Sequence, residues 1–333
     1  MAVRLYRAEE NSTRMQRNAY AETMAVLMDE NPDIVALDAD LASSVNMAKV
    51  MEDRPGQSVN CGIAEANMIS VAAGLSTTGK IPYAHTFAVF ASRRVCDQIY
   101  MSACYAGANI RIIGSDPGIA SSFNGGTHMP FADMAILRSM PEITLLEPTD
   151  CAMTEALIRE LANRKGVFYV RLYRKYAPHI YSPDTTFEIG KAMTLREGSD
   201  VTLIAGGMMV AEALRAAEAL DKENISARVL DMFTWKPLDE EVIRTAVRET
   251  GCIVTAENHS IVGGLGSAVA EVVCQTTPIP MEMVGVKDLF GEVGTEEWLK
   301  ERFCLRAEDI AVAAKKVIGR KKDNKEGKVC KSS

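Results

Sequence analysis

Apolar runs that end in polar or acidic residues recur along the first half of the chain, as is typical of buried strands. They occupy 33–40, 110–116, 143–150 and 166–173. Between them, longer stretches such as 91–107 and 151–164 carry apolar residues at helical spacing. Because strands alternate with helices, the pattern predicts an α/β fold in which a parallel sheet is covered on both faces.

The same alternation restarts after a gap and predicts a second doubly wound domain with a mainly parallel sheet. Its strand-like and helix-like stretches are 200–207, 210–224, 226–233, 240–251, 252–259 and 263–276. The gap, 174–187, has two prolines and no period, which indicates an interdomain linker. We expect domains at 1–178 and 191–318, joined by a linker at 179–190. The polar, charged residues 319–333 are expected to be disordered.

Composition agrees with two domains and narrows the classes of function. A chain of 333 residues suits two domains of about 150 residues each. The net charge of -7 argues against a nucleic-acid partner, because phosphate binding normally needs a basic surface. The N-terminus lacks the apolar core of a signal peptide and no apolar run is long enough to span a membrane, so a cytoplasmic location is expected.

Ligands of open parallel sheets bind beyond the carboxyl ends of the strands, and three loops there carry candidate chemistry. They are 36–44 (ALDADLASS), 62–65 (GIAE) and the glycine-rich 114–128. The first is equally consistent with a helix cap. In the second, Glu65 stands among small and apolar residues, where an isolated carboxylate costs several kcal/mol unless it is paired. Glu65 is therefore a functional carboxylate or an acid stabilised by a helix N-terminus.

Several of these blocks together carry a family resemblance. The sequences GIAEANMISVAAGL, GKIPYAHTFAVFASRRVCDQI and NGGTHMPFADMAILRSMPEITLLEPTD resemble the pyrimidine-binding domain of transketolase. Residues 191–272, with ARVLDMFTWKPLD and ENHSIVGGLGSAV, resemble its C-terminal domain. The resemblance implies a thiamine diphosphate-dependent transferase that moves a two-carbon ketol unit from a ketose phosphate to an aldose phosphate.

The resemblance also implies the residues that meet the cofactor. Glu65 would contact N1′ of the aminopyrimidine and activate it, since a carboxyl group in an apolar pocket can share a proton with a ring nitrogen. Phe87 and Phe90 would pack against the pyrimidine ring, although two aromatics in a short apolar run are also typical of plain core. Ile63 would lie at the cofactor, and His128 would reach the reacting end of the donor as a second catalytic residue.

Substrate contacts follow position by position from the same resemblance. Arg14, Ser44 and Arg174 are expected to hold the sugar phosphate. The full set of expected substrate-binding residues is Arg14, Ser44, Asp116, Asn124, His128 and Arg174. Asp116 stands where transketolases usually have a histidine, and Asn124 where they have an aspartate. A negative charge beside a substrate phosphate is unfavourable in a poorly solvated cleft. A non-classical donor, such as apulose 4-phosphate or a sulfonated ketose, is therefore an alternative.

The diphosphate-binding half of a transketolase carries a GDG motif, which this sequence lacks. We expect that half, with its Mg²⁺, on a separate N-terminal subunit, and no metal ligand in this chain. The expected assembly is a heterotetramer with two copies of each chain. A 2-oxo acid dehydrogenase beta subunit, a deoxyxylulose phosphate synthase-like subunit and a non-catalytic paralogue remain alternatives.

Overall fold

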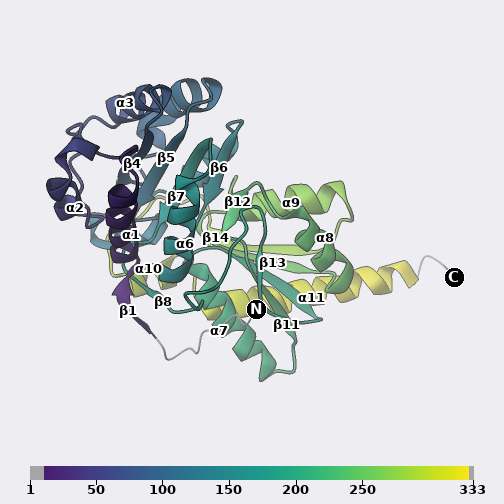
Figure 1. Ribbon diagram of the computed structural model, residues 1–333. Coiled ribbons are helices and arrows are strands. Elements are labelled where there is room, and N and C mark those ends of the chain that lie inside the picture. The colour runs from purple at the N-terminus through teal and green to yellow at the C-terminus, as the bar shows by residue number, and fades with distance from the viewer. Residues whose placement is uncertain (1–10, 330–333) are drawn as a thin grey trace.

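The computed structural model describes residues 11–329, and their larger sheet has seven strands in the order β12-β6-β7-β5-β4-β2-β3 (Figure 1). These strands are β2 (Ile34–Asp38), β3 (Ser58–Asn60), β4 (Ile81–Phe87), β5 (Ile110–Ser115), β6 (Ile143–Leu146), β7 (Val167–Leu172) and β12 (Thr234–Lys236). All neighbours are parallel except β12, which pairs antiparallel with β6. The strand order changes direction along the chain, as in doubly wound folds.

Helices cover both faces of this sheet. They are α1 (Gln16–Glu30), α2 (Ala48–Asp53), α3 (Glu65–Thr77), α5 (Asp133–Arg138) and α6 (Cys151–Ala162), with short 3-10 turns at η1 (Pro55–Gln57), η2 (Arg93–Val95) and η4 (Gly118–Asn124). One core contains the inner faces of α1 and α6, and another contains those of α3 and η3 (Ile99–Tyr105). The helix predicted at 91–107 is irregular, because η2 is followed by the short α4 (Cys96–Gln98) and the π-helical η3.

The second domain has a five-stranded sheet in the order β14-β13-β10-β11-β9. Its strands are β9 (Met193–Arg196), β10 (Val201–Ala205), β11 (Ala227–Asp231), β13 (Ile253–Ser260) and β14 (Met281–Val286). Its helices are α7 (Met209–Asp221), α8 (Glu240–Glu249), α9 (Leu265–Gln275), α10 (Glu296–Arg302) and α11 (Ala307–Val329). Only β9 runs antiparallel to its neighbour. The predicted α/β fold with two mainly parallel sheets is confirmed.

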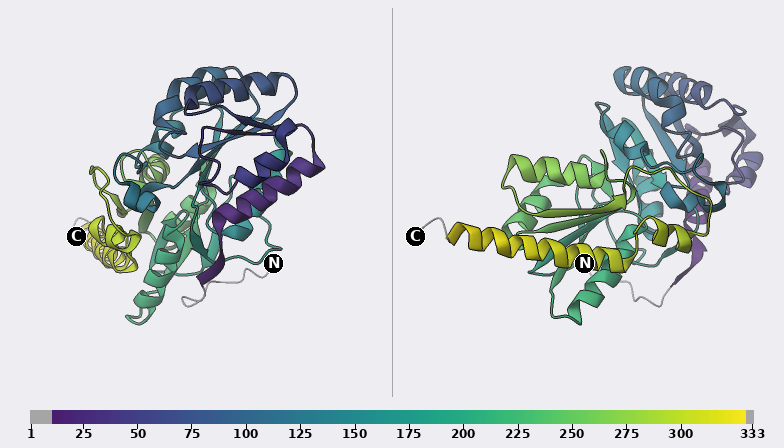
Figure 2. Two further views of the ribbon diagram at one scale, coloured as in Figure 1. Left: turned by 90° about the vertical axis from the view of Figure 1, so that its left-hand side faces the viewer. Right: turned by 180° about the vertical axis from the view of Figure 1, so that it is seen from behind.

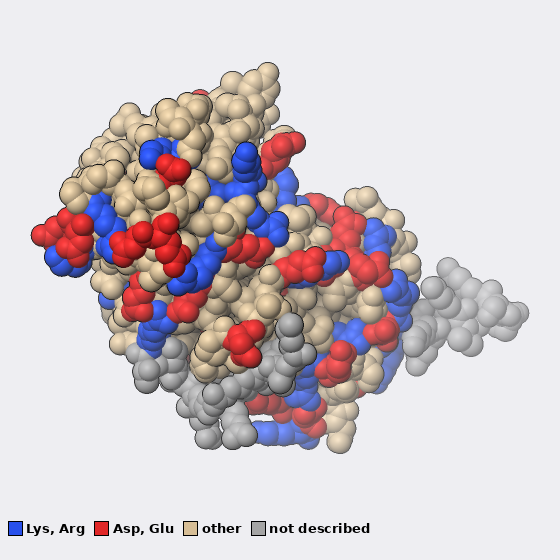
Figure 3. Space-filling model, viewed as in Figure 1, with Lys and Arg blue, Asp and Glu red and all other residues tan. Residues whose placement is uncertain are grey.

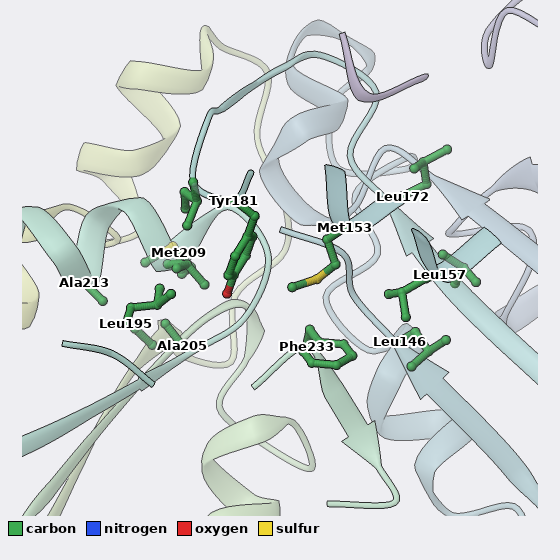
Figure 4. Packing of buried hydrophobic residues seen from close by; sticks show 14 of the residues in the cluster. Leu146, Met153, Leu157, Leu172, Tyr181, Leu195, Ala205, Met209, Ala213 and Phe233 are labelled. Carbon is green, nitrogen blue, oxygen red and sulfur yellow. The ribbon is translucent and has the colours of Figure 1, made fainter. Parts of the chain in front are cut away.

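The two domains share strands and core. β12 lies in the second half of the sequence but completes the edge of the first sheet. The segment expected to be a linker is packed rather than loose, since Ile180, Tyr181 and Phe187 are buried. Before it, β8 (Tyr176–Pro178) pairs with β1 (Asn11–Met15). Figure 4 shows Phe233 and Tyr181 between core residues of the two domains, so one hydrophobic core continues across the junction.

A buried arginine holds an ion-pair network in the first domain and reaches the second domain through a hydrogen bond. Arg171 of β7 is fully buried, with its Nε 2.8 Å from Asp133 and its Nη1 2.7 Å from Glu147. Its Nη2 donates to the backbone oxygens of Pro130 and Asn258, the latter in the second domain. Every charge of this network has a partner, which a buried charge requires.

The C-terminal residues correct one prediction. α11 continues to Val329 along the second domain, so the predicted disorder is wrong for 319–329, and 330–333 lie outside the described residues (Figure 2). Lysine and glutamate are good helix formers, and the helix is tied to the domain by its basic side chains. Arg320 pairs with Glu282 at 2.6 Å, and Lys321 donates to the backbone oxygen of Thr250. Within residues 11–329, no helix is long and apolar enough to cross a membrane.

Candidate active site

The candidate residues gather at one edge of the first sheet, beyond the carboxyl ends of its parallel strands. Phe87 ends β4, Asp116 directly follows β5, and Arg174 lies two residues after β7. Glu65 begins α3, which follows β3. Parallel strands place all their carboxyl ends together, so residues far apart in the sequence form one site.

Glu65 is buried and has a partner that the sequence analysis did not identify. Only 2% of its side chain is exposed, and its Oε1 accepts a hydrogen bond from Nη1 of Arg94 at 2.6 Å. A buried carboxylate at this position needs a partner, and within the described residues Arg94 provides it. Arg94 is 45% exposed at its side chain, so the ion pair lies at the mouth of the site. Ile63, in the preceding loop, is 77% exposed.

Three rings form a continuous aromatic cluster beside this ion pair. The ring centroid of His128 lies 5.9 Å from that of Phe87 and 5.4 Å from that of Phe90, and the two phenylalanines are 6.0 Å apart. The guanidinium carbon of Arg94 lies 3.9 Å from the centroid of the Phe90 ring. Phe87 is buried, whereas Phe90 is half-buried. Phe90 is therefore the more accessible of the two rings, and Phe87 packs beside it in the core.

Asp116 forms the other end of the site together with Arg174. The Asp116 carboxylate is 1% exposed and lies 2.6 Å from Nε of Arg174. Burial raises the pKa of Asp116 to about 6, and the charge of Arg174 and a hydrogen bond from Ser115 oppose that rise. The guanidinium of Arg174 also lies 5.7 Å from the ring centroid of Phe87. Ionic and aromatic contacts thus connect Asp116 to Glu65 across the whole site.

The structure places Arg17, rather than the predicted Arg14, next to Ser44. Nη1 of Arg17 donates to the backbone oxygen of Ser44 at 3.3 Å, and its charge lowers the pKa of Asp116. Arg14 instead pairs with Glu22 and Glu155, on α1 and α6. Arg14 lies in β1 and Arg17 in the first turn of α1, only three residues apart, so the sequence alone could not decide between them.

The loop that carries Asn124 and His128 is held against the second domain. Asn124 is exposed at the end of η4. Gly126 has no room for a side chain, because a Cβ there would lie 2.3 Å from the backbone oxygen of Gly291. Lys175, another residue absent from the prediction, donates to Ser122 of this loop at 2.6 Å and to Glu296 at 3.2 Å. Contacts from both domains therefore fix the approach to His128.

Comparisons with known proteins identify the family to which such a site belongs. The model of the transketolase pyrimidine binding domain matches residues 12–178, and that of the transketolase C-terminal domain matches residues 190–310. The chain belongs to the transketolase family. This confirms the predicted resemblance.

Its relatives include proteins that are named as transketolase subunits. The chain is 48% identical to a 6-deoxy-6-sulfo-D-fructose transketolase subunit of Clostridium sp., over 92% of this chain and 95% of the relative. It is 37% identical to one of the subunits of the apulose-4-phosphate transketolase of Phocaeicola vulgatus, over 82% of this chain and 87% of the relative. A solved structure described as a split gene transketolase, inactive beta4 tetramer, matches with a TM-score of 0.86 and 44% identity, over 92% of this chain and 99% of the other.

The family implies thiamine diphosphate, and the residues at the site fit its aminopyrimidine half. A flat nitrogen-containing group needs an acceptor at its edge and an aromatic face beneath it, and Glu65 and Phe90 present these side by side. The guanidinium of Arg94 is itself such a group. Among residues 11–329, no cluster of three or more histidine, cysteine or acidic side chains is suited to a metal ion.

Proposed function

We propose that this chain is the C-terminal subunit of a two-chain transketolase that moves a ketol unit from an anionic ketose to an aldose phosphate. The observation that carries the proposal is a buried carboxylate, Glu65, near the half-buried ring of Phe90, with the ring of His128 5.4 Å from that of Phe90. Thiamine diphosphate, when bound, supplies the carbon nucleophile that such a transfer needs.

Each side chain then has a defined task. Glu65 would hold a proton at N1′ of the aminopyrimidine, and its burial strengthens that hydrogen bond. Phe90 and Phe87 would fix the plane of the ring. His128 would contact a hydroxyl at the reacting end of the donor, where an imidazole can bind or move a proton. The exposed Ile63 would cover the edge of the ring once the partner is in place.

We infer that an N-terminal subunit supplies the diphosphate and Mg²⁺ site, in a heterotetramer with two copies of each chain. In support, α3 and η3 lie against each other and form an uncharged surface, since 66–79 and 98–110 contain no charged residue. Figure 3 shows few charges in the part of the surface around α3. Tyr100, Met101 and Tyr105 of η3 are 44%, 47% and 81% exposed. Exposed apolar surface of this kind is typical of a protein interface.

The charges at the far end of the site favour a donor with one negative charge. The positive charges of Arg174, Lys175 and Arg17 all act on Asp116. Lys175 is paired with Glu296 and Asp116 neutralises one arginine, so one positive charge is left over. One net positive charge suits a sulfonate better than a phosphate dianion, whose second charge would be unmatched. The relative named for 6-deoxy-6-sulfo-D-fructose supports this choice of donor class. We therefore propose a sulfonated ketose as the preferred donor, with classical or branched ketose phosphates as alternatives.

The test uses the chain purified together with its N-terminal subunit. Ketol transfer is measured with 6-deoxy-6-sulfofructose, xylulose 5-phosphate and apulose 4-phosphate as donors. Glu65→Gln should lower kcat at least a hundredfold, because a positioned proton-transfer group typically contributes that much. The matched control is Glu218→Gln, which removes an exposed charge from α7. Turnover by Glu65→Gln close to the normal rate would disprove the assignment, and transfer from none of the three donors would disprove the reaction.

A further inference from the structure

We propose that Arg94 is an internal ligand of the aminopyrimidine site, which must leave before thiamine diphosphate can bind and so lowers the affinity for the cofactor. The inference rests on the proposed function, because it takes Glu65 and Phe90 as the aminopyrimidine site. Nothing in the family resemblance requires an arginine at this position. It follows from two contacts of one side chain.

Both contacts of Arg94 use the groups assigned to the cofactor. Its Nη1 donates to Oε1 of Glu65 at 2.6 Å, and its guanidinium carbon lies 3.9 Å from the centroid of the Phe90 ring. The second distance is that of a stacked cation, since attraction extends to about 6 Å. One flat group therefore meets the carboxylate with its edge and the aromatic ring with its face.

A guanidinium and an aminopyrimidine match the same surroundings. Both are planar, both present N–H groups at an edge to a carboxylate, and both stack on an aromatic face. The two groups cannot occupy the ring face of Phe90 at the same time, because each requires van der Waals contact with it. Binding of the cofactor and closure of the Glu65–Arg94 ion pair are therefore mutually exclusive.

Arg94 can leave without disturbing the core. Its side chain is 45% exposed, and it stands in the short turn η2 rather than in a long helix. While it stays, it gives the buried carboxylate of Glu65 an ionic partner, which an isolated subunit otherwise lacks. The side chain thus stabilises the site before assembly and competes with the cofactor afterwards.

The competition has a calculable form. When only a fraction of molecules has an open site, the apparent Kd equals the intrinsic Kd divided by that fraction. The ion pair, whose arginine is partly exposed, and the cation–π contact together favour the closed site on the order of tenfold. Removal of Arg94 should therefore tighten cofactor binding about tenfold. Long-range electrostatics alone predicts that removal of Arg94 raises the Kd, since loss of a positive charge weakens binding of an anionic diphosphate.

The experiment is a titration of the two-chain complex with thiamine diphosphate and Mg²⁺ by isothermal calorimetry. Arg94→Ala and Arg94→Gln should each lower Kd about tenfold relative to the unmodified complex. The matched control is Arg93→Ala, the adjacent exposed arginine, which removes the same charge and should leave Kd unchanged or raise it. If Arg94→Ala fails to assemble, Arg94→Gln decides, because it keeps the length of the side chain.

The thermal stability of the isolated chain gives a second readout, in which loss of Arg94 is unfavourable rather than favourable. Because Arg94 is the ionic partner of Glu65, Arg94→Ala should lower the melting temperature of the isolated chain, while Arg93→Ala should not. A Kd for the Arg94 variants equal to or above that of the unmodified complex would overturn the inference. If Glu65→Gln is then inactive, the proposed function still stands. If Glu65→Gln is fully active, the assignment of the site itself fails.

Discussion

Asp116→Asn should change the preference of the enzyme for the charge of its donor. The substitution keeps the size of the side chain and removes the negative charge that pairs with Arg174 at 2.6 Å. The site then carries two uncompensated arginines, Arg17 and Arg174. A phosphate dianion gains more from this change than a sulfonate monoanion, because the gain scales with the charge of the ligand.

The size of the effect follows from the geometry. Arg174 faces Asp116 with its Nε, so an anion on the outer nitrogens of the same guanidinium lies ~6 Å from the carboxylate, where a unit charge is worth about 3 kcal/mol at an effective dielectric constant of 20. A dianion carries one more unit charge than a monoanion, so the substitution favours the dianion by about 3 kcal/mol more. The ratio of kcat/KM for phosphate over sulfonate donors should therefore rise on the order of a hundredfold in the variant.

The assay is a comparison of donors by kcat/KM in the two-chain complex at pH 7.5 and low ionic strength. Because the pKa of Asp116 is raised to about 6, the residue is charged at pH 7.5 and largely protonated at pH 5. The difference between the variant and the unmodified enzyme should therefore shrink at pH 5. Glu218→Gln is again the control for net charge. An unchanged donor ratio at pH 7.5 would refute the electrostatic argument.

Three further predictions concern stability and assembly. Arg171→Met leaves two buried carboxylates unpaired and should cost about 3–5 kcal/mol in urea unfolding, and a loss below about 1 kcal/mol would contradict this. Burial raises the pKa of Asp231 to about 7, so the folded chain keeps a proton that the unfolded chain releases near pH 4. The unfolding free energy should therefore fall as pH rises between these values, by up to about 1.4 kcal/mol per pH unit. Asp231→Asn should flatten this slope. An equal slope in the variant and the unmodified chain would disprove Asp231 as the origin of the pH dependence. Tyr105→Glu places a charge on the uncharged α3 and η3 surface and should weaken binding of the N-terminal subunit at least about tenfold, measured by sedimentation velocity. The control is Tyr176→Glu, at an exposed position on β8, which should leave binding unchanged. Equal binding of both variants would exclude the α3 and η3 surface as the subunit interface.

The sequence predicted those features of the molecule that depend on local pattern. The alternation of strands and helices was sufficient to predict the α/β fold of both domains. The segments that follow the strands contained Glu65, Asp116 and His128. Arg94 was missed because its pairing with Glu65, 29 residues away, depends on how η2 and α3 approach each other. Arg17 was missed for a related reason, since Arg14 lies in β1 and Arg17 in α1, and only the packing of these two elements decides which arginine reaches Ser44. Composition alone predicted a disordered tail, but packing against the second domain stabilises α11.

The strand β12 has a consequence for the order in which the chain can fold during synthesis. β6 ends at Leu146, but its antiparallel neighbour begins at Thr234, so this edge stays open while the intervening residues are made. An open strand edge is a template for pairing with other chains. A fragment that stops at the end of the first domain should therefore aggregate, whereas one that extends past Lys236 can close the edge. The first sheet is therefore complete only once the chain has been made as far as β12.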